Sequence, residues 1–482
     1  MTAAAAVRIN IPLIIGGEEI KTTNQYPVNS HIDPNAVIHN FSTFNIKDSS
    51  LLDMLYTSAK TGFEEWSTTP YDKKIKIFQK AIALLNERKS QLFDSHSDIG
   101  GPAWFAGFNV DGAIGQIEEY ISHLSNPIGV VPQSLDTELA LTIKQPIGPV
   151  LAIAPWNAPV ILASRSIVAP LAAGCSVIHK TSEKSPLASY LFVKCFHDAG
   201  LPKDALQLVH VSPQDNPQFL EQVLSSGVIK KLNFTGSTAV GKKIAAAAAS
   251  HLVPCLLELG GKNYSLVRKD ADLSKAVPNI IWSSWSHKGQ ICMSTEKVYV
   301  HEDIYDTFKG EVLKLSSEIS KDSDYAIPQR DLVFTKKIID LVDDAVDKGA
   351  QVLFGDYNKD EYLKNNSISP LIIEGVTEEM LLDTTESFGP IFTIHKYSDE
   401  DKLIKQLNDS PYGLKASIWS QDIMKALSIA KRIEIGGIHI NHSTVHDEAT
   451  IPHGGVKSSG HGRFNSSWGI DEFSILKSIT IN

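Results

Sequence analysis

The chain has 482 residues, of which 43% are hydrophobic and 21% are charged, and its formal net charge is −10. This length and composition predict a globular protein with a large core divided into two or three domains. The acidic balance argues against a nucleic acid partner, and no stretch of about 18 apolar residues predicts a membrane-spanning helix.

The first 20 residues lack the basic start of a secretory signal. The four cysteines, Cys175, Cys195, Cys255 and Cys292, lie far apart and form no CxxC pair. Free thiols suit a reducing compartment, so we expect a cytoplasmic protein.

Helices are predicted over residues 50–97, where apolar side chains recur at helical spacing between charged ones. Residues 137–146 alternate between apolar and polar side chains like an edge strand. After residue 146, short apolar runs alternate with amphipathic stretches. The strand-like runs are VLAIAP, SVIHK, LQLVHV and KKLNFTG, and the helix-like stretches between them are residues 185–200 and 216–227. This alternation predicts a parallel sheet covered by helices.

The second half again alternates short apolar runs with amphipathic stretches, over residues 298–321, 340–355 and 414–433. This alternation predicts a second α/β domain. Residues 469–482 end in a β-rich segment. A strand at the end of a chain can pair with another strand or with another subunit.

Six motifs stand in a fixed order along the chain. They are PWNAPV at 155–160, FTGSTAVG at 234–241, LELGGK at 257–262, GQICMST at 289–295, ESFGPI at 386–391 and PHGGVKSSGHGR at 452–463. Each motif alone is a weak signal, but together the sequence resembles the aldehyde dehydrogenase superfamily from about residue 10 to its end.

The resemblance implies an aldehyde dehydrogenase-like α/β fold with three parts. They are a Rossmann-like NAD-binding domain at residues 1–127 and 147–257, an α/β catalytic domain at 258–440, and a small β oligomerisation element at 128–146 and 469–482, in which the hairpin 128–146 pairs with the C-terminal strand. It also implies a homodimer or a homotetramer.

Cys292 matches the nucleophile of the family. A lone cysteine is more often a buried, inert thiol, and we expect that fate for the other three cysteines, whose neighbours are apolar. A free thiol has a pKa of about 8.5, so a nucleophilic cysteine needs a site that favours the thiolate.

Asn157 and Glu258 match the other catalytic residues of the family. Asn157 follows a predicted strand, where it would donate a hydrogen bond to the oxyanion together with the Cys292 backbone N–H; the alternative is an ordinary turn asparagine. Glu258 would activate the water that hydrolyses the thioester, although a loop salt bridge is the alternative. Members of the family often carry a second glutamate after the GxGR motif, but Phe464 follows Arg463 here.

The resemblance also implies the cofactor residues. Lys180 and Glu183 would hold the adenosine ribose, and a carboxylate there favours NAD over NADP. Gly236 and Ser237 would face the pyrophosphate at a helix N-terminus. The remaining candidates position the nicotinamide or line its cleft, and they are Ile153, Trp156, Glu386 and Phe388.

Three segments, at 103–110, 155–165 and 440–455, look most like the benzaldehyde-type branch, which includes vanillin and salicylaldehyde dehydrogenases. An aromatic aldehyde is therefore the expected substrate, with a broad or aliphatic specificity as the alternative. Candidates for its pocket are Trp104, Phe105, Phe108 and Ile291. Arg165 either meets a ring hydroxyl of the substrate or is a buried arginine paired with a carboxylate, and the sequence does not distinguish these.

The sequence argues against two other functions and against a metal site. A CoA-acylating dehydrogenase typically lacks the glutamate of LELGGK, and a catalytically inactive structural relative could lose Cys292, Asn157 or Glu258, yet all three are present. Four histidines, His439, His442, His446 and His453, lie in one run, but the run is not helical and the family needs no metal. We expect none.

Overall fold

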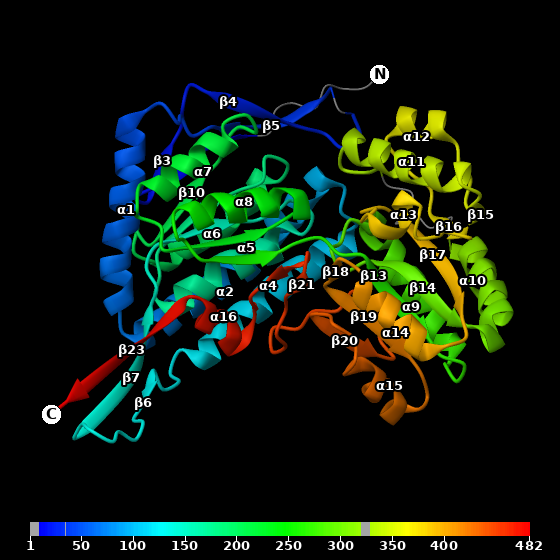
Figure 1. Ribbon diagram of the computed structural model, residues 1–482. Coiled ribbons are helices and arrows are strands. Elements are labelled where there is room, and N and C mark those ends of the chain that lie inside the picture. The colour runs from blue at the N-terminus through cyan, green and yellow to red at the C-terminus, as the bar shows by residue number, and fades with distance from the viewer. Residues whose placement is uncertain (1–8, 34, 320–327) are drawn as a thin grey trace.

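The computed structural model describes residues 9–33, 35–319 and 328–482. The first eight residues of the predicted cofactor domain, residue 34, and residues 320–327, which include the end of the predicted stretch 298–321, lie outside the described residues. Two lobes, each built around a β-sheet, stand side by side, and a small three-stranded sheet projects from the first (Figure 1).

The sheet of the first lobe has eight strands. In spatial order they are β22 (Gly460–His461), β12 (Cys255–Glu258), β11 (Lys231–Thr235), β8 (Val150–Ile153), β9 (Val177–Lys180), β10 (Leu206–Val209), β2 (Leu13–Ile15) and β3 (Glu18–Ile20). The five strands from β12 to β10 run parallel, which confirms the predicted parallel sheet. The outer strands β22, β2 and β3 run antiparallel.

Helices cover both faces of this sheet, as a buried parallel sheet requires. They are α1 (Ser49–Thr68), α2 (Tyr71–Glu87), α3 (Lys89–His96), α4 (Ala103–His123), α5 (Pro159–Ala173), α6 (Pro186–Ala199), α7 (Asn216–Ser225) and α8 (Thr238–Ser250). Helices α1 to α3 confirm the helical prediction for residues 50–97. Helix α1 begins where the Asp48 side chain accepts hydrogen bonds from the first-turn N–H groups of Ser50 and Leu51.

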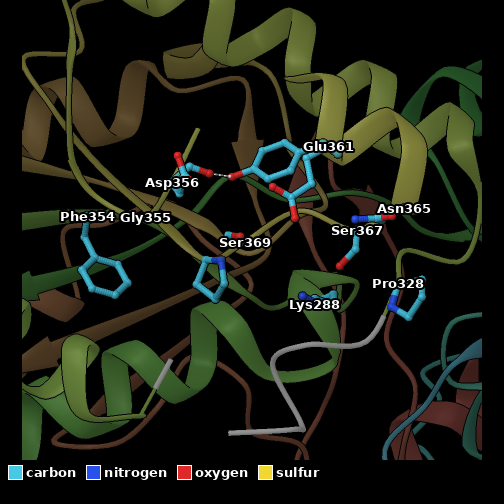
Figure 2. A pocket seen from close by; sticks show the side chains of 11 residues that line it. Lys288, Pro328, Phe354, Gly355, Asp356, Glu361, Asn365, Ser367 and Ser369 are labelled. Atoms are coloured by element: carbon cyan, nitrogen blue, oxygen red, sulfur yellow. Dashed lines mark hydrogen bonds between the residues drawn. The ribbon is translucent and has the colours of Figure 1, made fainter. Parts of the chain in front are cut away.

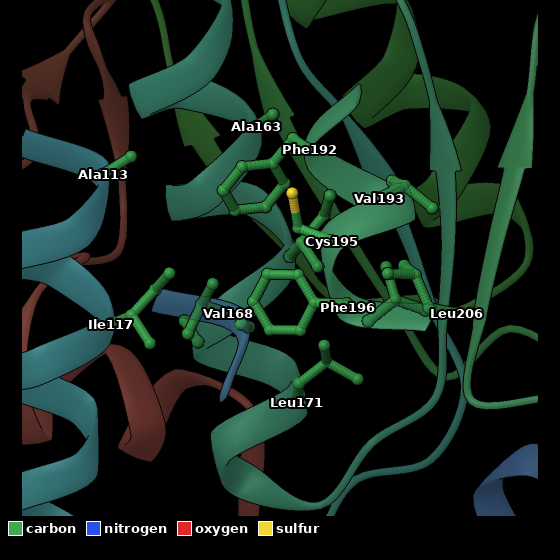
Figure 3. Close-up of a cluster of buried hydrophobic side chains, with 14 of the residues drawn as sticks. Ala113, Ile117, Ala163, Val168, Leu171, Phe192, Val193, Cys195, Phe196 and Leu206 are labelled. Carbon is green, nitrogen blue, oxygen red and sulfur yellow. The ribbon is translucent and has the colours of Figure 1, made fainter. Parts of the chain in front are cut away.

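The core of the first lobe lies in two layers. On one face, α2, α4, α5 and α6 pack together, and Figure 3 shows Phe192, Phe196 and Cys195 of α6 against Val168 and Leu171 of α5. On the other face, α1, α7 and α8 pack against the same strands. Helix α5 is buried along nearly its whole length, so it forms a rigid support beneath the loop that precedes it.

The second lobe holds a seven-stranded sheet. In spatial order its strands are β15 (Gln351–Phe354), β16 (Leu371–Glu374), β17 (Ile391–Tyr397), β14 (Thr295–His301), β13 (Asn263–Val267), β19 (Lys415–Trp419) and β20 (Gly437–Ile440). All pairs are parallel except β15 with β16. The helices of this lobe are α9 (Leu273–Trp285), α10 (Tyr305–Ile319), α11 (Leu332–Asp347), α12 (Lys359–Asn365), α13 (Leu381–Thr384), α14 (Glu400–Asp409) and α15 (Ile423–Ala430). The second α/β unit predicted from the sequence is therefore present.

The chain passes directly from β12 of the first sheet to β13 of the second through residues 259–262. This short crossing brings the carboxyl end of the first sheet to the amino end of the second. After β20 the chain returns to the first lobe, where β22 pairs with β12 and α16 (Ser466–Glu472) packs on α4 and α5. Two smaller sheets complete the fold, with strands β1 (Asn10–Ile11), β5 (Val37–Ser42) and β4 (Gln25–Asn29) in one and β18 (Tyr412–Gly413) and β21 (Val456–Lys457) in the other.

The projecting sheet consists of β23 (Ser474–Ile481), β7 (Leu139–Pro146) and β6 (Gly129–Val130) in that order. The prediction of an edge strand at 137–146 is wrong, because β7 lies in the middle, between β6 and the C-terminal strand. The predicted pairing of the C-terminal segment with another strand is confirmed. Within the described ranges, no helix has the length and apolar character needed to cross a membrane.

Candidate active site

In the first sheet, the order in which the chain adds strands reverses between β8 and β11. From β8 the chain moves to β9 and β10 on one side, and it then returns to β11 and β12 on the other. Ligands of such sheets bind at this switch point, beyond the carboxyl ends of the strands. A cleft of about 150 Å³ opens there.

The cleft collects many of the sequence-predicted residues from both lobes, although Ile153, Lys180 and Glu183 are not among the residues that line it. Its lining includes Trp156 and Asn157 after β8, Gly236 and Ser237 after β11, Glu258 at the end of β12, and Cys292, Glu386 and Phe388 from the second lobe. The linear motifs therefore meet at one place, although their residues are separated by more than 200 positions.

A larger hollow of about 640 Å³ lies in the second lobe (Figure 2). It is lined by Lys288, Asp356, Glu361 and Ser369 among others, and none of the predicted catalytic residues borders it. The buried Lys288 ammonium donates to the carbonyl of Ile368 at 3.0 Å. The smaller cleft is therefore the candidate active site.

Cys292 lies in the loop just before β14, at the amino end of the second sheet. The Asn263 side-chain amide donates to the Cys292 carbonyl at 2.8 Å, which fixes the loop. Gly289 has a φ of 67°, and a Cβ there would lie 2.0 Å from the carbonyl oxygen of Gly389, so only glycine fits at this turn. Burial and the adjacent Glu258 carboxylate raise the pKa of the Cys292 thiol well above its usual value, so the resting thiol is protonated.

Asn157 is 6% exposed and lies between the end of β8 and α5. Its Nδ2 donates to the carbonyl of Gln290, two residues before Cys292, at 2.9 Å. This bond ties the amide to the cysteine loop and leaves its second N–H for another acceptor. The predicted oxyanion donor thus lies in the cleft beside the nucleophile loop.

Glu258 ends β12 with its side chain 1% exposed. Its Oε2 accepts from Arg165 at 3.0 Å, its Oε1 accepts from His453 Nε2 at 2.7 Å, and the Cys292 Sγ lies 3.7 Å from the same Oε1. Burial alone would raise the pKa of Glu258, but the charges of His453 and Arg165 outweigh it and lower that pKa to about 2. The carboxylate is therefore ionised at neutral pH.

Arg165, on α5, is buried, and its guanidinium pairs with Glu258 and with Asp447. Its other neighbour is the ring of Phe464, 5.8 Å from the guanidinium carbon. The second of the two alternatives for Arg165 is the one found in the structure. The prediction that Arg165 meets a substrate hydroxyl is not supported, because two carboxylates already neutralise its charge.

The cofactor side of the cleft begins at α8. Ser237 caps this 13-residue helix by accepting from the N–H of Val240 at 3.4 Å. The N–H of Gly236 instead donates to the carbonyl of Glu258 at 3.0 Å, so Ser237 and the first turn of α8 are left to face an anion. Lys180 ends β9 and pairs in the sheet with Ile153, which ends β8, while Glu183 lies in the turn three residues after Lys180.

Glu386 and Phe388 reach the cleft from the second lobe. Glu386 accepts from the backbone N–H of Gly261 at 3.0 Å, and burial together with Glu296 raises its pKa to about 7. Glu296, which we did not single out in the sequence, accepts from the N–H groups of Ser387 and Phe388 and pairs with Lys262 at 2.5 Å. The only local signal for it was a charged residue within an otherwise buried strand.

The residues present fit a nicotinamide dinucleotide. Trp156 forms an aromatic wall with Phe334 and Phe388, at ring distances of 5.4 and 6.1 Å, which suits a flat ring. A Cβ on Gly260 would lie 2.6 Å from the Glu386 carboxylate, so glycine at this position lets Glu386 pack against the backbone. The open N-terminus of α8 suits a diphosphate.

The opposite side of Cys292 is apolar. Phe105 and Ile291 are buried in one cluster with Met293, Leu414 and Val445, and Cys292 packs against it. Trp104 and Phe108 contact Phe105 from the outside, with 37% and 42% of their surfaces exposed. These two predicted pocket residues therefore stand at a rim, and the sequence interpretation missed Met293, Leu414 and Val445, whose segments carry no aromatic signal.

The remaining cysteines do not line the cleft, and the rings of His439, His442 and His446 contact one another. Cys175 and Cys195 are fully buried, but Cys255 is partly exposed, which corrects the expectation that it is a core residue. Burial raises the pKa of all three thiols to about 11. No group of His, Cys, Asp and Glu side chains in the described part of the chain is arranged to hold a metal ion.

Comparisons with known proteins agree with this geometry. A model of the aldehyde dehydrogenase family matches residues 23–479. Vanillin dehydrogenase from Pseudomonas sp. (strain HR199 / DSM 7063) is 36% identical over 483 residues, which cover 98% of each chain. A salicylaldehyde dehydrogenase from Pseudomonas putida G7, solved with salicylaldehyde, has a TM-score of 0.93 at 32% identity over 98% of each chain. A betaine aldehyde dehydrogenase from Staphylococcus aureus, solved with NAD+, has a TM-score of 0.91 at 25% identity over 98% of this chain and 95% of that one.

Proposed function

The chain belongs to the aldehyde dehydrogenase family, and from that premise we propose that it oxidises an aromatic aldehyde to the carboxylic acid with NAD. The observation that carries the proposal is the meeting of Cys292, Asn157 and Glu258 in one cleft between the lobes. The relatives that act on vanillin and salicylaldehyde support the substrate class.

Chemistry begins at the thiol. Cys292 Sγ attacks the aldehyde carbon after losing its proton, and Asn157 stabilises the resulting oxyanion with its free N–H. A bound nicotinamide would supply the hydride acceptor, and its positive charge would favour the Cys292 thiolate. The acyl group then remains on Cys292 as a thioester until Glu258 takes a proton from the water that hydrolyses it.

NAD is proposed over NADP because of Glu183. A carboxylate in the turn after β9 accepts hydrogen bonds from a 2′-hydroxyl and repels a 2′-phosphate. The solved relative that holds NAD+ supports the same assignment.

Aromatic substrates are expected to have the higher kcat/KM. Burying roughly 100 Å² of a benzene ring against the Phe105 cluster at about 25 cal/mol per Å² gives about 2.5 kcal/mol, or on the order of 70-fold. Following NADH absorbance with benzaldehyde, vanillin, salicylaldehyde and acetaldehyde measures this ratio.

Phe105→Ala should reduce the ratio of kcat/KM for benzaldehyde to kcat/KM for acetaldehyde, because it removes the ring that lies deepest in the cluster. Phe108→Ala, on the same helix but at the exposed rim, is the matched control and should reduce this ratio less. If acetaldehyde equals benzaldehyde in the parent enzyme, the aromatic assignment fails and the dehydrogenase activity stands.

We also propose that the protein forms a homodimer or a homotetramer through the projecting sheet. Four apolar side chains of β23, namely Ile475, Leu476, Ile479 and Ile481, expose between 39% and 70% of their surface. A long exposed apolar strand is the kind of surface that another subunit covers.

Replacing Leu476 and Ile479 together by Asp should lower the particle mass in light scattering to that of a monomer, because charges cannot be buried at the interface without a partner. Lys477→Ala, on the same strand, is the control and should leave the mass unchanged. A parent protein that is already monomeric would contradict the proposal.

A further inference from the structure

Three buried ionisable side chains surround the catalytic carboxylate of Glu258. Arg165 comes from α5, Glu258 from β12, and Asp447 and His453 from the segment between β20 and β21. Each side chain exposes 6% of its surface or less. The mechanism above uses Glu258 and leaves His453 without a role.

His453 is held in one orientation by its backbone. Its N–H donates to the carbonyl of Phe464 at 3.2 Å, and the N–H of Phe464 donates back at 2.8 Å. Gly454, directly after it, has a φ of 159°, and a Cβ there would lie 2.5 Å from the carbonyl of Gly462. The turn after His453 is thus packed tightly, and the imidazole points at Glu258.

The two carboxylate oxygens of Glu258 contact three neighbouring side chains. Arg165 binds Oε2, while Oε1 faces both His453 Nε2 at 2.7 Å and Cys292 Sγ at 3.7 Å. A carboxylate oxygen has two lone pairs, so the bond from His453 occupies one of them and leaves the other directed at the nucleophile. This is the place where the proton of the hydrolytic water must be accepted.

The imidazole lies among charged groups on several sides. Glu258 faces Nε2, Asp447 Oδ1 lies 3.4 Å from Nδ1, and Arg165 bridges the two carboxylates. Lys415, His439 and Cys292 interact electrostatically with the same group of charges. The Arg165 guanidinium and the hydrogen bond from His453 Nε2 both contact the Glu258 carboxylate, which favours keeping Glu258 ionised in a buried site.

We propose that His453 is a positioning residue for thioester hydrolysis: its Nε2–H anchors Oε1 of Glu258, so that the remaining lone pair is aimed at the water attacking the acyl group on Cys292. This rests on the dehydrogenase function proposed above. In that step a water proton passes to Oε1, the water oxygen bonds to the acyl carbon, and the carbon–sulfur bond breaks to release the acid and the Cys292 thiolate. His453 gains and loses no covalent bond.

The test compares pre-steady-state and steady-state NADH formation with benzaldehyde and NAD. In His453→Phe, the first equivalent of NADH should form within about threefold of the parent rate, because hydride transfer precedes hydrolysis, and the steady-state rate should fall at least about tenfold. His453→Gln keeps an N–H donor near the Nε2 position, so it should recover most of the steady-state rate at pH 8.

The pH profile separates positioning from packing. His453 lowers the pKa of Glu258, so its loss should raise that pKa, and the acid limb of the steady-state rate should move to higher pH in both variants. A residue that merely fills space would not move this limb. His446→Gln, in the same segment but paired with the exposed Glu448, is the control and should match the parent.

Each failure has a distinct meaning. The role of His453 would be overturned if the rate of the first equivalent of NADH and the steady-state rate fell equally. It would also be overturned if the steady-state rate and its acid pH limb stayed unchanged in both variants. Thermal melting and NAD affinity show whether His453→Phe is folded. If it is not, the acid limb of the steady-state rate in His453→Gln tests the role of His453. Absence of any NADH from the parent enzyme would instead overturn the proposed function.

Discussion

Cys292→Ala is expected to lower kcat for aldehyde oxidation by more than about 10⁴-fold while leaving the fold and NAD affinity nearly unchanged. The methyl side chain cannot form the covalent bond to the aldehyde carbon, so hydride transfer loses its substrate. The loop keeps its shape because the Asn263 amide holds the backbone carbonyl of residue 292 rather than its side chain. NADH absorbance gives kcat, and NAD titration by fluorescence gives the affinity.

The matched control for this variant is Cys255→Ala. Cys255 is the other partly exposed thiol, and it lies at the start of β12, at the opposite end of the strand from Glu258. Its replacement should leave kcat within about twofold of the parent, since surface substitutions outside a site change little. Turnover that survives in Cys292→Ala, or is lost in Cys255→Ala, would mean that another thiol carries the reaction.

Glu258→Gln should slow steady-state turnover by about 10²- to 10⁴-fold, because an amide cannot take the proton from water. The first equivalent of NADH should still form quickly, since the thioester is made before the base is needed. Stopped-flow absorbance would then show a burst followed by a slow phase.

The control for this second variant is Glu448→Gln, which removes an exposed carboxylate next to Asp447 without touching the buried charges. It should show the parent rates. If burst and slow phase fall together in Glu258→Gln, the carboxylate 3.7 Å from Sγ also takes the thiol proton, and its role would extend to activating Cys292.

The sequence predicted most of the fold because its periodicities are local. The apolar spacing of residues 50–97 indicated helices, and the short apolar runs after residue 146 indicated parallel strands. The edge-strand prediction for residues 137–146 was wrong because alternation along one segment does not show how many strands flank it. The pairing of β7 with the C-terminal strand was predicted correctly, from the resemblance rather than from the alternation.

Residues from several motifs line one cleft because these motifs end or begin strands at the facing edges of the two sheets. The network around Glu258 could not be predicted in the same way. Arg165 and His453 are each ordinary in their own segments, and only the folded chain brings them to one carboxylate across 93 and 195 positions. Glu296 escaped notice for the same reason, since its partners are backbone N–H groups 91 and 92 residues away.

Electrostatics of the thiol also required the structure. The site of a nucleophilic cysteine usually lowers the pKa of the thiol. In this structure, burial and Glu258 instead raise the pKa of Cys292. The neighbours that raise this pKa are brought to the thiol only by folding, since Glu258 lies 34 positions away in the sequence.

Detection of the acyl group on Cys292 tests the central claim most directly. Glu258→Gln is mixed with benzaldehyde and NAD, quenched in acid after the burst, digested, and analysed by mass spectrometry. The account predicts a benzoyl group on the peptide that contains Cys292, in an amount equal to the NADH formed in the burst. NADH formed without that adduct, or an adduct on Cys255 instead, would contradict it.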